Sequence, residues 1–532
     1  MTPKDYKRPP ESYQFDADVI VIGAGSAGCY TALNLAPLKV AMISPQNLGG
    51  ESSSLWAQGG IAAAVAKDDT PDLHIRDTLK AAAGTADIDA VRRVTEAAPD
   101  IIKDLNLLNV QFDRAEDGSY TLNREACHST RRVLKAKAGD GFGRALMSTL
   151  IENVKQSPHV NVMFPYTAER LSMDADQNIN GVYIKHIETG EITLYRAKAV
   201  VLATGGLGGL YDTTTNPLSS VGRGVALAAE VGAVLSDLEF VQFHPTALDI
   251  GLDPAPLATE ALRGDGARLV NDLGEYFMDD DHPMKDLAPR DIVSRSIFKQ
   301  LQKGRTVYLD CTDIETEKFP ALCTACEKVG IDPQKTPVPV RPATHYHMGG
   351  IDTDEHGRTS IVGLWAVGEV GATGLHGANR LASNSLMEAL VMGQRAGRDI
   401  VSIFSRLKAD TVPAVEQPTV MRFNPELRQV YIKHLRQTMS TCVGVARDES
   451  DLKEAIDVFQ DVMDETQDID LDIYDRALVG YLIASDALKR TESRGGHYRI
   501  DYPQSEKSWK HRSYRVYKHT HTTKPFIYEV AE

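Results

Sequence analysis

The sequence has few cysteines, no long apolar run and no excess of basic residues. Its six cysteines are scattered over 532 residues, too few for a disulfide framework in a chain of this size. Cys323 and Cys326 form a C-x-x-C pair, which suits a redox or metal site. However, Glu327 follows where a c-haem site has histidine, and no second pair exists for zinc. We predict reduced, structural thiols on a helix and no metal site.

No apolar stretch approaches the length that a helix needs to cross a bilayer, and residues 1–15 are polar. We therefore expect no membrane span, no signal peptide and a cytoplasmic location. The 58 basic against 73 acidic residues give a net charge of −15, which argues against general binding of nucleic acid or of an anionic membrane. Small molecules are the expected partners, and a local basic pocket for a small dianion is compatible with this charge.

The sequence does contain an apolar run, residues 18–22, that opens into G-x-G-x-x-G and then into a helix predicted over residues 29–36. Glycines at these positions let the backbone approach a pyrophosphate at the helix N-terminus; an ordinary glycine-rich loop is the alternative. Residues 199–206 and 363–369 are two further apolar strands that end in glycine. Because strands of a doubly wound sheet can converge on one ligand, the sequence favours a dinucleotide site.

The next strand, residues 39–43, ends at Ser44, where an NAD fingerprint has an acidic residue for the ribose. This departure weakens an NAD assignment and leaves FAD open. Residues 51–64 are small and polar around two glycines, so their backbone suits a flat ring, although a plain loop has the same composition.

Length and composition indicate a globular protein of two to four domains. We predict a small meander of three strands, at residues 160–164, 179–186 and 192–197. After a linker, helical spacing predicts a bundle of three helices, at residues 424–442, 451–467 and 474–490. The linker is expected at residues 408–417.

Residues 238–346 are interrupted by glycine and proline and are typical of an α+β insertion. Serine and asparagine side chains before residue 387 are expected to cap the helix that follows, residues 387–404. Basic and aromatic residues mix over residues 507–518, where we expect a surface strand rather than nucleic-acid binding.

Polar residues gather in motifs along the insertion and on either side of it. These are A-Q-G-G-I at residues 57–61, Q-F-H-P-T at 242–246, T-E-A-L-R-G at 259–264, P-R-D at 289–291, H-Y-H-M-G-G-I at 345–351, G-E-V at 368–370 and H-G-A-N-R-L-A-S-N-S-L at 376–386. With the glycine fingerprint, they resemble the L-aspartate oxidases, members of the flavoprotein superfamily that includes the flavin subunits of succinate dehydrogenase and fumarate reductase. The resemblance covers roughly residues 18–490.

The resemblance implies FAD and an α/β fold with a Rossmann-like FAD-binding domain in two parts. The expected domains are the two FAD-binding parts at residues 1–238 and 347–408, an inserted α+β capping domain at 239–346, a C-terminal helical bundle at 418–500 and a tail at 501–532. The residues expected to bind FAD are Gly23, Gly25, Ser26, Ala27, Gly28, Ser44, Ser52, Ser53, Ser54, Gln58, Gly59, Gly60, Gly205, Glu369, Asn384, Ser385 and Leu386.

The same resemblance implies roles in oxidising a four-carbon dicarboxylate, which needs cations for two carboxylates, a hydride acceptor and a proton acceptor. The residues expected to bind substrate carboxylates are Gln242, His244, Thr259, His345 and Arg380. Arg290 matches the arginine that exchanges a proton with substrate, and Glu260 and Arg263 match its relay to solvent. Because arginine is an improbable base in water, an electrostatic clamp without proton transfer is the alternative.

Three features favour aspartate over succinate or fumarate. Ser53 stands where succinate dehydrogenases attach FAD through a histidine, so we expect the flavin to be noncovalent. N-R-E-x-x-H at residues 123–128 resembles the oxidase loop, in which Glu125 would face the substrate ammonium. Ala382 gives the arginine motif its oxidase form. The resemblance thus implies oxidation of L-aspartate to iminoaspartate with electrons passed to oxygen or fumarate, the first step of de novo NAD biosynthesis, with quinolinate synthase consuming the product.

Alternatives remain open at this point. A soluble fumarate reductase, or the flavin subunit of a membrane complex, is one, and a noncatalytic flavin-binding protein is another. The latter is motivated by Arg223, which stands where the superfamily has an acidic residue near the flavin. A reversed charge beside the cofactor would either weaken FAD binding or be compensated by a nearby acid such as Glu230 or Asp237. Ala126 and Cys127 also replace two glycines of the oxidase loop.

Overall fold

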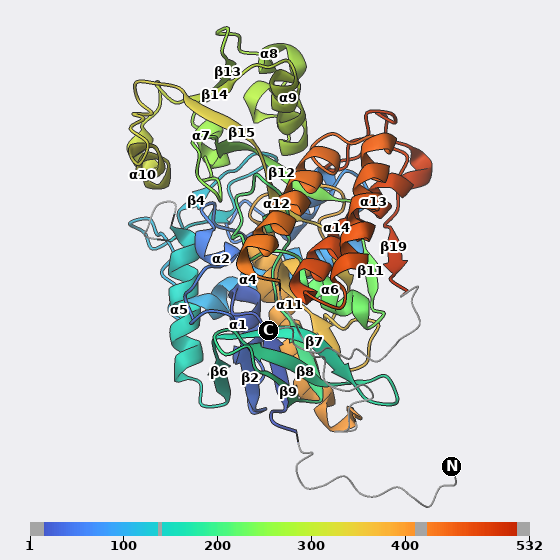
Figure 1. Cartoon of the computed structure of the whole chain (residues 1–532). Helices are drawn as coiled ribbons and strands as arrows, with labels where there is room; N and C mark the ends of the chain where they lie inside the picture. Colours follow the sequence, from blue (N-terminus) through green and yellow to red (C-terminus); the bar gives the residue numbers. More distant parts are fainter. Residues whose placement is uncertain (1–14, 137–140, 410–422, 519–532) are drawn as a thin grey trace, which may run out of the picture.

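The computed structural model describes residues 15–136, 141–409 and 423–518. A five-stranded parallel sheet lies in the lower part of the molecule, with strand order β17-β10-β1-β2-β6 (Figure 1). Its strands are β1 (Val19–Ile22), β2 (Val40–Ile43), β6 (Val160–Met163), β10 (Ala199–Leu202) and β17 (Leu364–Ala366). The predicted convergence of three distant strands is confirmed, because β10 pairs with β1 on one side and β17 on the other.

Each face of this sheet is buried in a different hydrophobic cluster. Val19 and Val21 belong to one cluster and Ile20 and Ile22 to the other, as the period of two along a strand requires. Helices α1 (Ser26–Leu33), α4 (Ile88–Leu107), α5 (Phe142–Gln156) and α11 (Asn384–Ile403) contribute to the first cluster, and α3 (Pro71–Ala81) packs on α4. The second cluster includes α6 (Arg223–Glu230) and a meander of β7 (Tyr166–Met173), β8 (Ile179–His186) and β9 (Ile192–Arg196).

The assignment of residues 160–164 to the predicted meander was wrong. Residues 160–163 form β6, which pairs in parallel with β2, and the meander's first strand is β7. A strand of four residues is too short for its own pattern to specify a partner, so tertiary context decides its sheet.

The expected α+β insertion is present and lies in the upper part of Figure 1. Its sheet has the order β12-β15-β14-β13, formed by β12 (Val241–Leu248), β13 (Arg268–Asn271), β14 (Val307–Asp310) and β15 (Val338–His347). Its helices are α7 (Glu260–Gly264), α8 (Met278–Asp281), α9 (Arg290–Gln302) and α10 (Pro320–Glu327). Cys323 and Cys326 lie on α10 as free thiols, as predicted. The domain boundaries themselves stay predictions.

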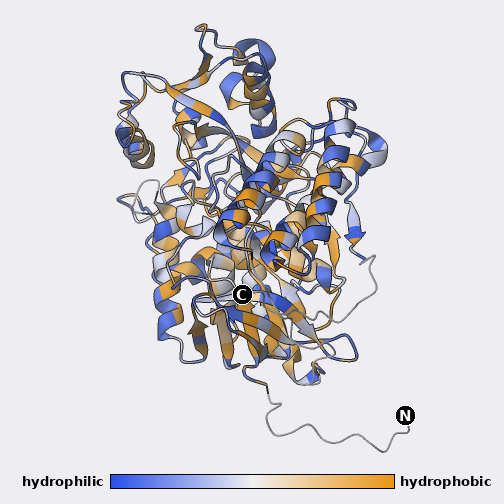
Figure 2. Cartoon of the chain, viewed as in Figure 1, coloured by the Kyte–Doolittle hydropathy of each residue, from blue (hydrophilic) through white to orange (hydrophobic). Residues whose placement is uncertain are grey.

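The three predicted C-terminal helices are α12 (Pro425–Cys442), α13 (Glu449–Thr466) and α14 (Leu471–Lys489), and they pack on one another. Asn424, Asp448 and Asp470 cap them with side-chain acceptors. Hydrophilic and hydrophobic residues alternate along α12 and α13, which bury one face each (Figure 2), whereas α14 is buried on most sides. The predicted linker lies largely outside the described residues.

Two small sheets complete the fold. The expected strand in the tail is confirmed as β19 (Tyr514–Val516), which joins β11 (Val234–Ser236), β16 (Gly350–Asp352) and β18 (Gly371–Ala372). The other sheet contains β3 (Ile61–Ala62), β4 (Leu122–Asn123) and β5 (Val133–Leu134).

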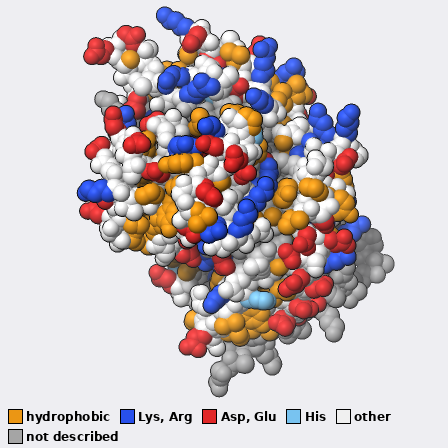
Figure 3. Space-filling model, turned by 90° about the horizontal axis from the view of Figure 1, so that it is seen from above, with side chains coloured by type: hydrophobic (Ala, Val, Ile, Leu, Met, Phe, Trp, Pro, Cys, Tyr) orange, Lys and Arg blue, Asp and Glu red, His pale blue; other side chains and the backbone are white. Residues whose placement is uncertain are grey.

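Acidic and basic side chains are interspersed on the face drawn in Figure 3, which looks down on the molecule of Figure 1. Among the described residues, no helix combines the length and the apolar composition that crossing a membrane requires.

Candidate active site

A cavity of about 770 Å³ lies where three strands of the parallel sheet end, beneath the α+β insertion. The loops after β1, β10 and β17 supply part of its lining through Gly25, Gly205 and Glu369. Parallel strands bring their carboxyl ends to one edge of the sheet, so residues far apart in sequence meet there.

The fingerprint glycines serve close packing as well as the cavity. A Cβ on Gly28 would lie 2.0 Å from the carbonyl oxygen of Gly23, and one on Gly23 would lie 2.3 Å from that of Ala203. By contrast, a Cβ on Gly25 would meet only the Ser54 hydroxyl, at 3.5 Å, so this part of the loop faces the cavity. The glycine loop therefore lets α1 begin close to the sheet and present its amide groups to a ligand.

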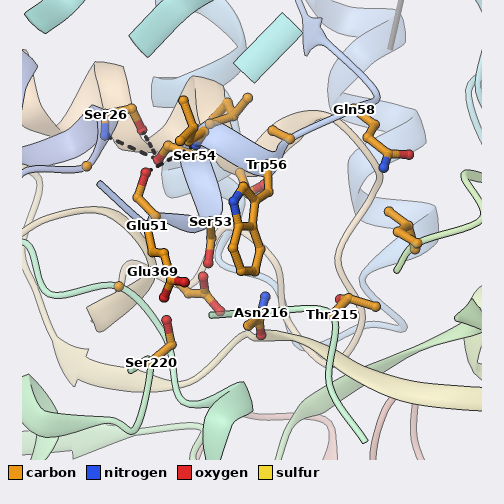
Figure 4. Close-up of a pocket in the computed structure, with 18 of the residues that line it drawn as sticks. Ser26, Glu51, Ser53, Ser54, Trp56, Gln58, Thr215, Asn216, Ser220 and Glu369 are labelled. Carbon is orange, nitrogen blue, oxygen red and sulfur yellow. Dashed lines mark hydrogen bonds between the residues drawn. The ribbon is translucent and has the colours of Figure 1, made fainter. Parts of the chain in front are cut away.

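The small-residue segment forms a second wall of the cavity. It contains a short helix, α2 (Ser53–Trp56), capped by the Ser52 hydroxyl, which accepts from the Leu55 amide at 3.2 Å. The hydroxyls of Ser54 and Ser26 lie 2.9 Å apart, and the Trp56 indole stands beside the cavity (Figure 4). Gly60, with φ +120°, has no room for a side chain, because a Cβ would lie 2.3 Å from the Leu134 carbonyl oxygen.

Most of the residues expected to bind cofactor line this cavity. They are Gly23, Gly25, Ser26, Ala27, Ser44, Ser52, Ser53, Ser54, Gln58, Gly59, Gly60, Gly205, Glu369, Ser385 and Leu386. Gly28 and Asn384 do not line it. Asn384 instead faces two residues of α3: its Nδ2 donates to the Thr78 hydroxyl at 3.0 Å, and its Oδ1 lies 2.8 Å from His74 Nε2.

The start of α11 differs from its predicted form. Ser383 is the N-cap residue, but its side chain makes no cap hydrogen bond and its φ is +64°. The hydroxyl donates instead to Glu125 Oε2 at 2.8 Å. The left-handed turn aims this side chain across the cavity wall rather than back at the helix, which leaves the first amides of α11 uncapped by side chains.

Two arginines from different elements meet in the site. Arg290, the first residue of α9, donates from Nε and Nη2 to Glu260 Oε2 at 2.9 and 2.7 Å. Arg380 donates from Nη1 to the Ser385 hydroxyl at 2.7 Å, and its guanidinium lies 4.6 Å from the centre of the Tyr346 ring. Burial and the nearby Arg290 lower the pKa of Arg380 to about 10.

Gln242 lies behind both arginines rather than in the cavity lining. Its Oε1 accepts from Arg290 Nη1 at 3.2 Å and from Arg380 Nε at 3.3 Å, while its amide nitrogen donates to Asn379 Oδ1 and to the Arg380 carbonyl oxygen, each at 3.0 Å. The side chain is 1% exposed. In this structure Gln242 positions the two guanidinium groups instead of offering a free donor to a ligand.

The acidic partner of Arg290 is itself held by a second arginine. Burial raises the pKa of Glu260, but the positive charges of Arg290 and Arg263 outweigh it and hold that pKa below its usual value. Arg263 Nη2 lies 3.5 Å from Glu260 Oε1, and Nη1 donates to the Asp286 carbonyl oxygen. Burial lowers the pKa of Arg263, which lies outside the cavity lining. The three expected catalytic residues thus form one buried chain.

A bulged pairing of β12 with β15 brings two histidines together. The rings of His244 and His345 lie 5.1 Å apart and line the cavity. The Thr246 amide donates to His244 Nδ1 at 3.3 Å, so Nε2 carries the ring proton, and it has no hydrogen-bond partner among the described protein groups. Burial and neighbouring arginines lower the pKa of both histidines well below the usual value, so they are neutral donors.

The carboxylate of Glu125 also faces this end of the cavity, from the loop after β4. It is 9% exposed, and besides the Ser383 hydroxyl it is in contact with Gly59, where a Cβ would lie 2.6 Å from Glu125 Oε1. A glycine at this position therefore makes room for the carboxylate. Thr259, which precedes α7, also lines the cavity.

Arg223 lies outside the lining of the cavity, contrary to the expected place beside the cofactor. Nor are its partners the predicted ones. Its guanidinium lies within 2.9–3.7 Å of carboxylate oxygens of Glu169, Asp472 and Asp475, on the meander and α14. The side chain points toward the C-terminal helices, which no local pattern around residue 223 could reveal.

Other residues of the site carried little signal in the sequence. The Thr215 hydroxyl lies 2.8 Å from His345 Nδ1, and Asn216 Nδ2 donates to the His345 carbonyl oxygen at 3.0 Å. Both line the cavity, as Figure 4 shows. A run of polar residues after a glycine-rich turn was their only sign. Among the described residues, no group of three or more His, Cys, Asp or Glu could hold a metal ion.

Comparison with known proteins identifies the family. The model of the FAD binding domain family matches residues 18–386, and that of the fumarate reductase flavoprotein C-terminal region matches residues 471–530. L-aspartate oxidase of Mesorhizobium japonicum is 44% identical over 489 residues, 91% of each chain, and that of Caulobacter vibrioides is 44% identical over 495 residues, 92% of this chain and 94% of the relative. The chain belongs to the L-aspartate oxidase family.

Solved structures of related flavoproteins agree with this assignment. A quinol-fumarate reductase has a TM-score of 0.85 at 29% identity, with 93% of this chain and 94% of that chain covered. Sdh1 of Mycobacterium smegmatis has a TM-score of 0.81 at 31% identity, with 93% and 90% covered. The α/β fold with its C-terminal helices is therefore that of the superfamily to which the L-aspartate oxidases belong, and FAD is the cofactor.

The residues of the cavity themselves fit FAD. The glycine loop at the start of α1 presents amides to a pyrophosphate, and the glycines at positions 59 and 60 leave flat backbone along the second wall. The start of α11, with Ser385 and Leu386 in the lining, offers uncapped amides to an electron-rich ring edge. Burial raises the pKa of Glu369, which accepts from the His347 amide at 3.0 Å, to about 7.

Proposed function

We propose that this protein catalyses the FAD-dependent oxidation of L-aspartate to iminoaspartate, with electrons passed to oxygen or to fumarate. The observation that supports this proposal best is the charge pattern of the cavity. Arg290 and Arg380 line the cavity together with the carboxylate of Glu125, which accepts from the Ser383 hydroxyl, whereas the Glu260 carboxylate is paired with Arg290. L-aspartate carries the complementary set of two carboxylates and one ammonium, whereas succinate and fumarate offer no partner for Glu125.

The residues of the chain bind and orient the substrate. Arg380 and the neutral donors His244 and His345, with Thr259, hold the carboxylates, and Glu125 accepts the ammonium. His244 Nε2 supports this role because it is a buried donor without a partner among the residues that the structure describes. Bound noncovalently beside these residues, FAD would supply an acceptor for the hydride of L-aspartate C2 and a carrier of two electrons to oxygen or fumarate.

In this proposal Arg290 exchanges a proton with the substrate, and Glu260 and Arg263 connect Arg290 to solvent. The two hydrogen bonds to Glu260 fix the direction of the guanidinium, and Gln242 fixes it from the other side. In fumarate reduction the charged arginine donates a proton to the alkene carbon opposite the hydride. An electrostatic clamp on the substrate uses the same geometry without proton transfer.

The product imine hydrolyses readily in water, so an enzyme that consumes it is expected. We propose that this enzyme is quinolinate synthase and that the reaction is the first step of de novo NAD biosynthesis. The cytoplasmic location expected from the sequence stays a prediction.

The proposed oxidation of L-aspartate is tested under anaerobic conditions. The purified yellow protein is mixed with L-aspartate and, in parallel, with succinate; flavin absorbance is followed; and air is then admitted. Bleaching by L-aspartate with recovery in air is the expected result. If neither compound bleaches the flavin but fumarate reoxidises the chemically reduced enzyme, the protein is a fumarate reductase instead.

A further inference from the structure

His128 ends the N-R-E-x-x-H motif, and no step of the proposed reaction uses it. The ring is 1% exposed, and its Nε2 lies 3.0 Å from the carbonyl oxygen of Ala382, 254 positions later in the chain. A carbonyl oxygen only accepts, so Nε2 carries the proton. Nδ1 is buried without a hydrogen-bond partner among the described groups. The single N–H donor of the His128 ring therefore forms its hydrogen bond with Ala382, the residue before Ser383.

Ser383 needs such support, because its φ of +64° is sparsely populated by residues other than glycine. A second histidine holds the other flank of the turn: His74 Nε2 lies 2.8 Å from Asn384 Oδ1, and the rings of His74 and His128 lie 6.0 Å apart. Between these two anchors, the Ser383 hydroxyl donates to Glu125 Oε2 at 2.8 Å. The strained turn thus orients the Glu125 carboxylate through the Ser383 hydroxyl.

Charge supports the same arrangement. Burial lowers the pKa of His74 to about 3, and burial lowers the pKa of His128 despite the nearby carboxylate of Glu125. Asp77 and Arg132 also act on His128, but Arg132 is committed to Asp69 and Asp77, at 2.9 and 2.7 Å. The His128 ring is therefore neutral. It does not neutralise the Glu125 carboxylate, whose charge can interact with a ligand.

We propose that His128 is a positioning residue for substrate selection: by holding the Ala382 carbonyl, it keeps the Ser383 turn in the orientation that points Glu125 at the ammonium group of the substrate. This inference rests on the proposed function. It predicts that His128 matters for ligands that carry an ammonium group and little for dicarboxylates that lack one.

Binding to the holoenzyme with its flavin already reduced tests this directly, because L-aspartate and succinate then bind without being oxidised. Dissociation constants are measured by anaerobic calorimetry for the wild type, His128→Leu, His128→Gln and Ser383→Ala. We expect His128→Leu to weaken L-aspartate about tenfold, as the loss of an orienting hydrogen bond to a charged group implies, and to change succinate less than about twofold. Glutamine keeps a neutral donor at similar reach and should restore most of the affinity for L-aspartate.

Ser383→Ala is the second route to the same result, since it removes the hydroxyl while leaving His128 in place. Its loss should match that of His128→Leu, and the double variant should be no worse than either, because both act through one hydrogen bond. Equal weakening of both ligands, or no weakening of L-aspartate, overturns the proposal. If the wild type itself fails to prefer L-aspartate over succinate, the proposed function fails instead.

Discussion

At the scale of single residues, the proposed chemistry depends most directly on Arg290. Arg290→Leu should abolish turnover and weaken dicarboxylate binding, because it removes a cation from the site together with the hydrogen bonds that Arg290 donates to Glu260. FAD should stay bound, since the cavity walls that carry the glycine loop and α2 are untouched. Steady-state rates and the flavin absorbance of the purified variant measure the two effects separately.

Arg290→Lys distinguishes proton exchange from an electrostatic clamp. Lysine keeps the charge but titrates lower, with a pKa of about 10.4 against about 12.5 or above for arginine. If residue 290 accepts a proton from L-aspartate, it must be neutral to react, so the ascending limb of the pH–rate profile moves to lower pH in the variant. If it acts only as a clamp, it must stay charged, so the activity of the variant instead falls as the lysine loses its proton.

The residue scale is also where sequence reasoning went furthest and where its limits are clearest. The resemblance that the motifs carry implied that Arg290, Glu260 and Arg380 share one site, and the structure brings all three into the lining of one cavity. The role of Gln242 was not visible, since its two arginine partners lie 48 and 138 positions away. The cap predicted at Ser383 failed because a tertiary acceptor, Glu125, competes with the helix amides.

At the scale of elements, α9 connects Arg290, the proposed catalytic residue, to the C-terminal region. Arg290 begins this helix, and Arg295 follows one and a half turns later. Arg295 donates from Nη1 to the Gly495 carbonyl oxygen at 3.2 Å, and its guanidinium lies 5.2 Å from the centre of the Tyr498 ring. Because Arg295 does not line the cavity, its contribution to the reaction comes through the placement of α9.

We expect Arg295→Met to lower kcat/KM for L-aspartate about tenfold, because small displacements of a catalytic group cost large factors in rate. Methionine keeps the apolar stem and loses the donors, and the core of the inserted domain, which lies elsewhere, should keep the melting temperature nearly unchanged. Arg305→Met is the matched control: the same change in the same domain, at a residue whose acidic partner Asp272 is 4.0 Å away. Equal losses in both variants would show a general effect on the domain rather than a contact specific to α9.

Elements were predicted well where their own pattern is long and periodic, as for the three C-terminal helices. The short strand β6 was assigned to the wrong sheet, and α2 was not foreseen within the small-residue segment. A helix of four residues has no periodicity to detect, and its start depends on one capping serine, Ser52.

At the scale of the whole molecule, Arg223 joins the FAD-binding part to the C-terminal helices. Its carboxylate partners come from β7 and α14, and the Ala168 carbonyl oxygen accepts from Nε at 2.7 Å. Together they outweigh the cost of burial and raise the pKa of Arg223 above its usual value. The charge reversal that looked like a departure beside the cofactor is thus a junction between β7 and α14, and its partners lie 54 positions away at Glu169 and 249 positions away at Asp472.

Arg223→Asp therefore tests stability rather than cofactor binding. An acidic side chain among three carboxylates should destabilise the protein by about 3–5 kcal/mol, as the loss of one partner of a buried ion pair does. Arg223→Lys should cost much less, because it keeps the charge, and Arg92→Asp at the exposed Arg92–Asp89 pair should cost little. Thermal melting with FAD fluorescence measures unfolding and cofactor release in one experiment. Release of FAD well below the unfolding transition of Arg223→Asp would return this residue to the cofactor site, whereas a common shift of both transitions assigns it to the junction between domains.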